Sequence, residues 1–96
     1  MAAYVIGQLE IHDPERYKSY LAGFMPIFER HNGELLATTG GETTVIEGRW
    51  GHPRTVVMKF PNRAAAERWL NDPDYKALAE HRYASAHCNL AMVDGV

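Results

Sequence analysis

The sequence predicts an α+β fold whose elements follow the order β-α-β-β-α-β. Two observations point to this order. Short segments rich in β-branched and aromatic residues alternate with segments whose apolar residues recur every three or four positions. The helical segments also begin with capping residues, Asp-Pro in two cases. The 96 residues suffice for a single domain over residues 1–96, and no linker-like run divides them.

The charge balance excludes several classes of function. Ten Lys and Arg residues face twelve Asp and Glu residues, for a net charge of −2, so we expect no nucleic-acid partner and no membrane partner. No apolar run approaches the roughly 20 residues of a membrane span, and the first residues lack the basic region of a secretory signal. The single cysteine, Cys88, excludes an intrachain disulfide and indicates a cytoplasmic location.

The first strand is predicted over residues 4–11, which are rich in Val, Ile and Tyr. Asp13 then supplies an N-cap, and Pro14 suits the first helical position, where its missing N–H costs nothing. Pro26 lies inside the apolar stripe of this helix and is expected to kink it or to end its first part. The pair at 32–33, Asn-Gly, predicts a left-handed stop.

The middle of the chain is predicted to be extended. Residues 34–39 form a short strand candidate that the two glycines at 40–41 break. Residues 42–47 form a second extended piece, and a turn over 48–53 leads to a strong strand over 54–60.

The second helix is predicted in two pieces. Asn62 caps a short helix that reaches Leu70, and Asp-Pro-Asp at 72–74 starts the next helix. The last strand covers 88–93. This is the ferredoxin-like arrangement, an antiparallel sheet with helices on one face.

The uncovered face of this sheet predicts self-association. If 48–53 forms a hairpin that places Glu47 opposite Arg54, each face carries at least two large aliphatic side chains, and Tyr4 and Ile6 join one of them. Because helices cover only one face, the other is an apolar patch typical of an interface. We expect a homodimer with its sheets face to face. The alternative is an amphipathic face that stays wet.

Arg82 is the most informative polar residue. It occupies a core-facing place between Leu78 and Ala86, where a guanidinium needs a carboxylate, a carbonyl or an anionic ligand. The alternatives are a structural ion pair or a side chain whose head reaches water. The predicted pair of Glu47 and Arg54 is architectural, but if Glu47 also reaches Arg82, the spare guanidinium receives a small carboxylate through two hydrogen bonds.

Aromatic side chains on the two helical regions are predicted to converge above the sheet. They are Tyr17, Tyr20, Phe24, Trp69 and Tyr75. Such stripes are typical of a packed core. Tyrosine hydroxyls beside one arginine also suit a planar, oxygenated small molecule, and this second interpretation stays open.

Most of the remaining reactive side chains are given structural interpretations. His31 ends the apolar stripe of the first helix and is a candidate base near a cavity beneath it. The five histidines show no metal-ligand spacing, and no glycine-rich phosphate loop is present, so we expect neither a metal nor a cofactor. Cys88 opens an apolar strand and is interpreted as an inert buried thiol.

An ordered set of motifs resembles a known family. The motifs are Asp13-Pro14-Glu15 with Tyr17, Gly40-Gly41, Glu47-Gly48, Arg54 through Phe60-Pro61, Ala65-Ala66 with Trp69, Pro73-Asp74-Tyr75, Arg82 and Val93-Asp94-Gly95-Val96. Together they resemble the DUF1330 family, a domain of unknown function, over nearly the whole chain. Two mild departures are Asn62, where the family usually has Ser, and Asp94, where it usually has Glu. The resemblance implies a dimeric α+β barrel, a superfamily with cofactor-free monooxygenases, isomerases, lactonising enzymes, some haem enzymes and members without known activity.

The sequence therefore predicts a homodimer that binds a small oxygenated or carboxylate metabolite between helices and sheet, with cofactor-free oxygenase or isomerase chemistry. The alternative is a non-catalytic dimeric binding or structural protein. The candidate ligand-binding residues are Tyr17, Tyr20, Phe24, His31, Glu47, Arg54, Trp69, Tyr75 and Arg82.

Overall fold

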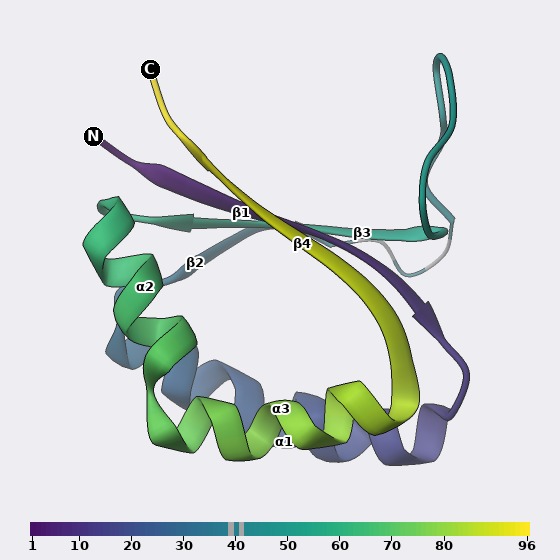
Figure 1. Ribbon diagram of the computed structural model, residues 1–96, viewed down its shortest axis with the longest axis horizontal. Helices are drawn as coiled ribbons and strands as arrows, with labels where there is room; N and C mark the ends of the chain where they lie inside the picture. The colour runs from purple at the N-terminus through teal and green to yellow at the C-terminus, as the bar shows by residue number, and fades with distance from the viewer. Residues whose placement is uncertain (39, 41) are drawn as a thin grey trace.

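A computed structural model describes residues 1–38, 40 and 42–96, which form two layers, a four-stranded sheet with helices on one face (Figure 1). The elements are β1 (Ala3–Ile11), α1 (Pro14–Arg30), β2 (Glu34–Thr38), β3 (Arg54–Phe60), α2 (Arg63–Asn71), α3 (Pro73–Ser85) and β4 (Ala86–Asp94). The strand order is β2-β3-β1-β4, and neighbouring strands are antiparallel. The predicted ferredoxin-like fold is confirmed.

The predicted helix starts are confirmed by their caps. The side-chain oxygens of Asp13, Asn62 and Asp72 accept backbone N–H groups of the first turns at 3.1, 2.8 and 2.8 Å. Pro14 and Pro73 follow at the first helical positions of α1 and α3, where no N–H is needed. These three starts are local decisions, because each cap lies within three residues of the N–H group that it satisfies.

The end of α1 differs in part from the prediction. The helix continues through Pro26 to Arg30, so of the two expected effects of Pro26, the end of the first part of the helix is wrong. Asn32 adopts the left-handed conformation of the stop, with φ of 60°. Gly33 is needed for a different reason: a Cβ at this position would overlap the ring of Phe28, which is fully buried.

The expected hairpin between the extended piece at 42–47 and the strand at 54–60 is wrong. β2 pairs with residues 56–59 of β3 along one edge and β1 pairs along the other, so β2 takes most of the edge that 42–47 would need. Residues 42–53 instead form a loop, called here the 42–53 loop. The predicted pairing of Glu47 with Arg54 is also wrong, because Glu47 lies in this loop outside any strand, whereas Arg54 pairs with Leu9 of β1. The predicted break at 40–41 and the strand end at residue 39 fall partly outside the described residues.

The core lies between the sheet and the helices. Val5 and Leu9 of β1 and Met58 and Phe60 of β3 point toward the helices and are buried. They pack against aromatic side chains of the helix layer, among which Trp69 is almost fully buried. Burying such side chains contributes on the order of 2 kcal/mol each. The helix layer is therefore held to one face of the sheet.

The outer face of the sheet has no helix over it (Figure 1). The strand register places Ile6 of β1 between Val57 of β3 and Ala91 of β4 on this face. Tyr4 lies next to Ile6 along the same face, beside Val93, so the centre of the face is apolar. An uncovered apolar sheet face marks an interface more often than a solvated surface.

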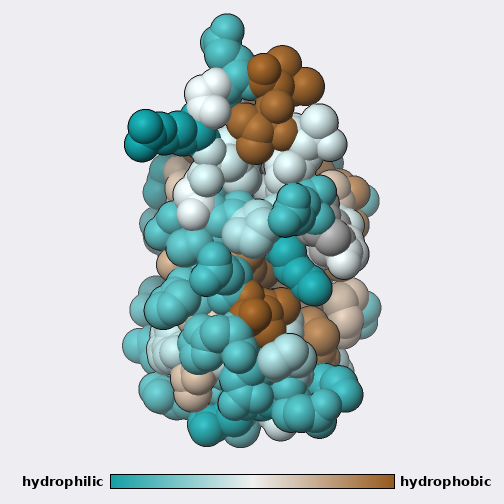
Figure 2. Space-filling view, turned by 90° about the vertical axis from the view of Figure 1, so that its right-hand side faces the viewer, coloured by the Kyte–Doolittle hydropathy of each residue, from teal (hydrophilic) through white to brown (hydrophobic). Residues whose placement is uncertain are grey.

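The 42–53 loop stands away from the sheet on the side opposite the helices (Figure 1). Its base is held by Thr43, whose N–H donates to the Pro53 carbonyl at 2.6 Å. Ile46 is 93% exposed, and hydrophobic surface is visible at this end of the molecule in Figure 2.

In the described part of the chain, no helix is both long and apolar enough to cross a bilayer.

Candidate functional site

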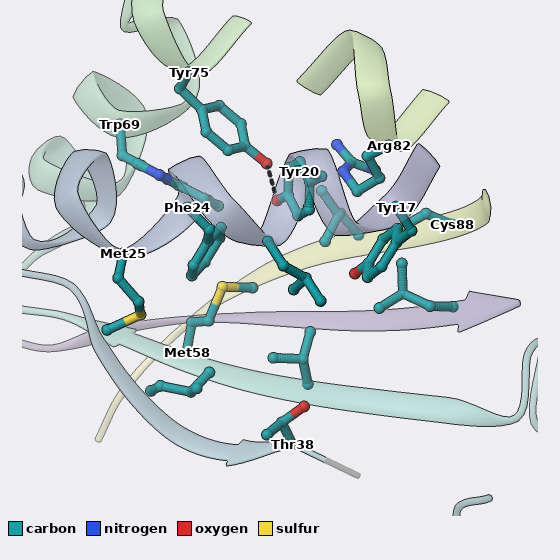
Figure 3. Close-up of a pocket in the computed structure, with 15 residues that line it drawn as sticks. Tyr17, Tyr20, Phe24, Met25, Thr38, Met58, Trp69, Tyr75, Arg82 and Cys88 are labelled. Atoms are coloured by element: carbon teal, nitrogen blue, oxygen red, sulfur yellow. Dashed lines mark hydrogen bonds between the residues drawn. The ribbon is translucent and has the colours of Figure 1, made fainter. Parts of the chain in front are cut away.

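A cavity of about 230 Å³ lies between the helix layer and the inner face of the sheet (Figure 3). The helix layer contributes Tyr17, Tyr20, Phe24, Trp69, Tyr75 and Arg82 to its wall. The sheet contributes Leu9, Thr38, Val56, Met58, Cys88 and Leu90, among others. Most of the wall is apolar, so the few polar groups decide which ligand is recognised.

The first polar group is a pair of tyrosine hydroxyls contributed by α1 and α3. The Oη atoms of Tyr20 and Tyr75 are 2.8 Å apart, and the two side chains point toward one another (Figure 3). Burial raises the pKa of both hydroxyls, so both stay protonated at neutral pH. One hydroxyl donates to the other, and the accepting hydroxyl keeps its own hydrogen for a further acceptor.

The second polar group is Arg82, whose side chain enters from the last turns of α3. The residue is only 7% exposed, and its Nε has no hydrogen-bond partner within the described part of the chain. No ion pair joins Arg82 to an acidic residue among those described, so the interpretation as a structural ion pair is not supported there. Its guanidinium carbon lies 5.7 Å from the Tyr20 ring centre and 5.0 Å from that of Tyr83.

Arg82 nevertheless keeps its charge. Burial lowers the pKa of the guanidinium, but the nearby Tyr75 and Tyr20 hydroxyls favour the charged form, and the net pKa lies above its ordinary value. Among the residues that line the cavity in the described chain, Arg82 alone is charged at neutral pH. A buried charge without an acidic partner costs several kcal/mol, which an anionic ligand would offset.

Two further groups on the wall stay neutral. Burial raises the pKa of the Cys88 thiol, and Arg82 only partly counteracts this. Burial also raises the pKa of the Tyr17 hydroxyl. Neither group is an ionised nucleophile or base at neutral pH. Trp69 adds a buried indole N–H that has no acceptor among the described residues. The wall therefore presents hydrogen-bond donors and one positive charge.

Six of the nine predicted site residues meet at this cavity. They are Tyr17, Tyr20, Phe24, Trp69, Tyr75 and Arg82. Their helical spacing placed them on the inner faces of their helices, and packing against the sheet brought these faces together.

The other three predicted residues lie elsewhere. His31 closes α1, and its Nε2 is 2.7 Å from Oδ2 of Asp72, which links the end of α1 to the start of α3. Glu47 is exposed on the 42–53 loop, away from the cavity wall. Arg54 begins β3 and is exposed. None of the three lines the cavity.

The sheet side of the cavity was not predicted as part of the site. Met58, Val56 and Leu90 line it, and each lies on the face of its strand that points to the helices. The alternation along 54–60 was a usable signal for two of them, because it already separated Val56 and Met58 from the opposite face.

Comparison with known proteins identifies relatives of this sequence and fold. A family model described as a domain of unknown function, DUF1330, matches residues 2–96. No curated protein matches the chain. Among solved structures, a protein of unknown function from Rhodopseudomonas palustris is 20% identical with a TM-score of 0.80, over 99% of this chain and 82% of that one.

Two further solved structures are similar. A dimeric ferredoxin-like protein of unknown function from Jannaschia is 15% identical with a TM-score of 0.74, over 99% of this chain and 100% of that one. SnoaB, a cofactor-independent oxygenase from Streptomyces nogalater, is 14% identical with a TM-score of 0.64, over 99% of this chain and 93% of that one. At such identities the likeness shows a shared fold, and function rests on the site.

Proposed function

The chain belongs to the DUF1330 family of unknown function, and we propose that it binds a small, mainly apolar molecule with an anionic oxygen in the cavity beneath α1. The volume of about 230 Å³ suits a body of one or two rings. Carboxylates, phenolates and enolates of this size are the ligand classes that match the wall.

Arg82 is the single observation that carries this proposal. A guanidinium that is 7% exposed, charged and without an acidic partner among the described residues is costly in the empty protein. An anionic oxygen of the ligand would accept from it through charge-assisted hydrogen bonds, roughly twice as strong as neutral ones. The free hydrogen of the Tyr20–Tyr75 hydroxyl pair offers a second contact for an oxygen of the ligand.

Cofactor-free oxygenase or isomerase chemistry is the reaction class that we propose for this site. Arg82 would stabilise the enolate or phenolate form of a bound carbonyl or phenol compound, which is the electron-rich form in both reactions. The protonated hydroxyls of Tyr20 and Tyr75 would hold the ligand ring by a further oxygen. The presence of a cofactor-independent oxygenase among proteins of this fold is compatible with the proposal.

A non-catalytic binding protein is the second candidate. It is favoured by the state of the cavity wall, where Tyr17, Tyr20, Tyr75 and Cys88 are all held protonated by burial. A substrate that must lose a proton after binding would find no ionised base on this wall. The catalytic proposal therefore applies to ligands that enter as anions.

A homodimer is the assembly that we propose, with the outer faces of two sheets packed together. The apolar centre of this face around Ile6 and Val57 supports the proposal, as does the exposed Ile46 on the 42–53 loop, which stands on the same side. Related folds from Jannaschia and Bacteroides fragilis are described as dimeric. The reducing cytoplasm is the location that we propose, because Cys88 is free.

The binding proposal is tested by calorimetric titration of phenols and small aromatic carboxylic acids into the native protein and into Arg82→Ala. We expect saturable binding to the native protein and a loss of about tenfold or more in the variant. Equal and negligible binding to both proteins would remove the basis of the proposal. For ligands that bind, oxygen uptake and product analysis then separate the enzyme from the binding protein.

A further inference from the structure

Arg82 borders a second space besides the cavity. A hollow of about 420 Å³ is lined by residues of α3, the start of β4 and the base of the 42–53 loop. Arg82 and Cys88 line both the cavity and this hollow, so these two side chains form the partition between them. Arg82 therefore borders both an apolar space and a polar one.

The hollow is rich in hydrogen-bond donors. His52, His87 and Asn89 line it together with Tyr83 and Arg82. The rings of His52 and His87 are nearly parallel, with their centres 6.4 Å apart and an angle of 22° between their planes. His52 and His87 are 35 residues apart in the chain, and the fold brings their imidazoles together.

Opposite charge is sparse around these imidazoles. No acidic residue lines the hollow within the described chain. Glu10 lies opposite His87 in the β1–β4 pairing but does not line the hollow. On its other side His87 faces His12, with ring centres 5.0 Å apart. Among the described residues no set of three His, Cys, Asp or Glu side chains is arranged to hold a metal ion. Because the hollow offers hydrogen-bond donors and no acidic side chain among the described residues, it favours an oxyanion over a cation.

We propose that the hollow is the subsite for the carboxylate of the ligand, whose apolar ring body fills the cavity beneath α1. This inference rests on the proposed function and narrows its ligand to aromatic or alicyclic monocarboxylic acids of one or two rings. Arg82 contacts the carboxylate at the partition, and His52 and His87 hold it from the side of the hollow.

The orientation of the ligand follows from this arrangement. The carboxylate lies at the partition next to Cys88, and the ring extends toward the paired hydroxyls of Tyr20 and Tyr75. A ring that bears an oxygen opposite its carboxylate would satisfy both polar ends of the site.

The test compares two probes of equal size, naphthalene-2-carboxylate and the neutral naphthalene-2-carboxamide, by titration calorimetry at neutral pH. The native protein is expected to bind the acid about tenfold or more tightly than the amide. His52→Ala and His87→Ala are each expected to weaken the acid about threefold or more and to leave the amide unchanged. His81→Ala is the matched control, because His81 lines neither space. It should change neither affinity.

The outcomes separate this inference from the proposed function. If the acid binds the native protein but His52→Ala and His87→Ala leave its affinity unchanged, the hollow is not the subsite and only the cavity proposal stands. An equal loss of acid and amide in these variants also overturns the inference, because it indicates a disturbed loop. If neither probe binds the native protein, the proposed function fails and this inference with it. Thermal unfolding of each variant checks that it is folded.

Discussion

The hydroxyls of Tyr20 on α1 and Tyr75 on α3 lie 2.8 Å apart within the cavity wall, and they join two residues that are 55 positions apart in the chain. This contact makes the two hydroxyls dependent on one another, because each side chain is almost fully buried.

Removing both of these hydroxyls should cost less than the sum of removing each alone. Tyr20→Phe removes the tyrosine partner of the buried Tyr75 hydroxyl, and the free energy of unfolding should fall by about 1–3 kcal/mol. The double variant with Tyr75→Phe should lose less than the sum of the two single losses, since the hydrogen bond between the hydroxyls can be lost only once. Denaturant unfolding at one fixed protomer concentration measures this. Strict additivity would contradict the pairing.

Replacing Arg82 by an apolar residue should weaken ligand binding without lowering the free energy of unfolding. Because the guanidinium is buried without an acidic partner among the described residues, Arg82→Met should unfold at a free energy equal to the native value or up to about 4 kcal/mol higher. Arg82→Lys keeps a positive charge and serves as the matched comparison. A large loss of stability in Arg82→Met would show that Arg82 has a structural partner and would weaken the binding proposal.

The pair of His31 and Asp72 should make stability depend on acid pH. The hydrogen bond from His31 and that from the Asp74 N–H hold the pKa of Asp72 below its ordinary value of 3.8. The unfolded chain therefore binds this proton more tightly, so the stabilisation is present above pH 3.8 and is lost as the pH falls through the lowered pKa.

Asp72→Asn tests this dependence, because asparagine caps a helix about as well as aspartate. Unfolding curves across the acid range should show that the free energy of unfolding of the native protein exceeds that of Asp72→Asn. This difference should shrink below pH 3.8. A constant difference between the two proteins down to strongly acid pH would contradict this role for Asp72.

The outer face of the sheet should hold two copies of the chain together. Ile6→Glu places a charge between Val57 and Ala91 at the centre of this face, and we expect it to convert a dimer into a particle of one chain, 10.8 kDa. Sedimentation at micromolar concentration measures the mass. Lys76→Glu on the exposed side of α3 is the control and should leave the dimer intact. A native protein that sediments as a single chain would refute the proposed dimer.

Several features of this protein can be predicted from short stretches of its sequence. Asp13, Asn62 and Asp72 start three helices because each cap satisfies an N–H group only two or three residues away. The inner side of α1, with Tyr17, Tyr20 and Phe24, likewise follows from helical spacing. These features need no information from distant parts of the chain.

The pairing of strands depends on residues that are far apart in the chain. Residues 42–47 have the composition of a strand, but β2, from earlier in the chain, pairs with residues 56–59 of β3 on the edge that a hairpin would use, and 42–47 forms no strand. Glu47 was therefore misplaced together with its predicted partner Arg54. The same reasoning applies to His31, whose position at a helix end was predicted but whose contact with Asp72 was not.

By itself the sequence determined the order of the elements, the inward side of each helix and the core-facing place of Arg82, because helix caps and periodicity act over a few residues. Only the tertiary structure decided that Arg82 meets tyrosines where an acid was one expectation, and that it borders both an apolar cavity and a polar hollow. The neighbours of a buried charge come from segments that only folding brings together, and no local pattern encodes them.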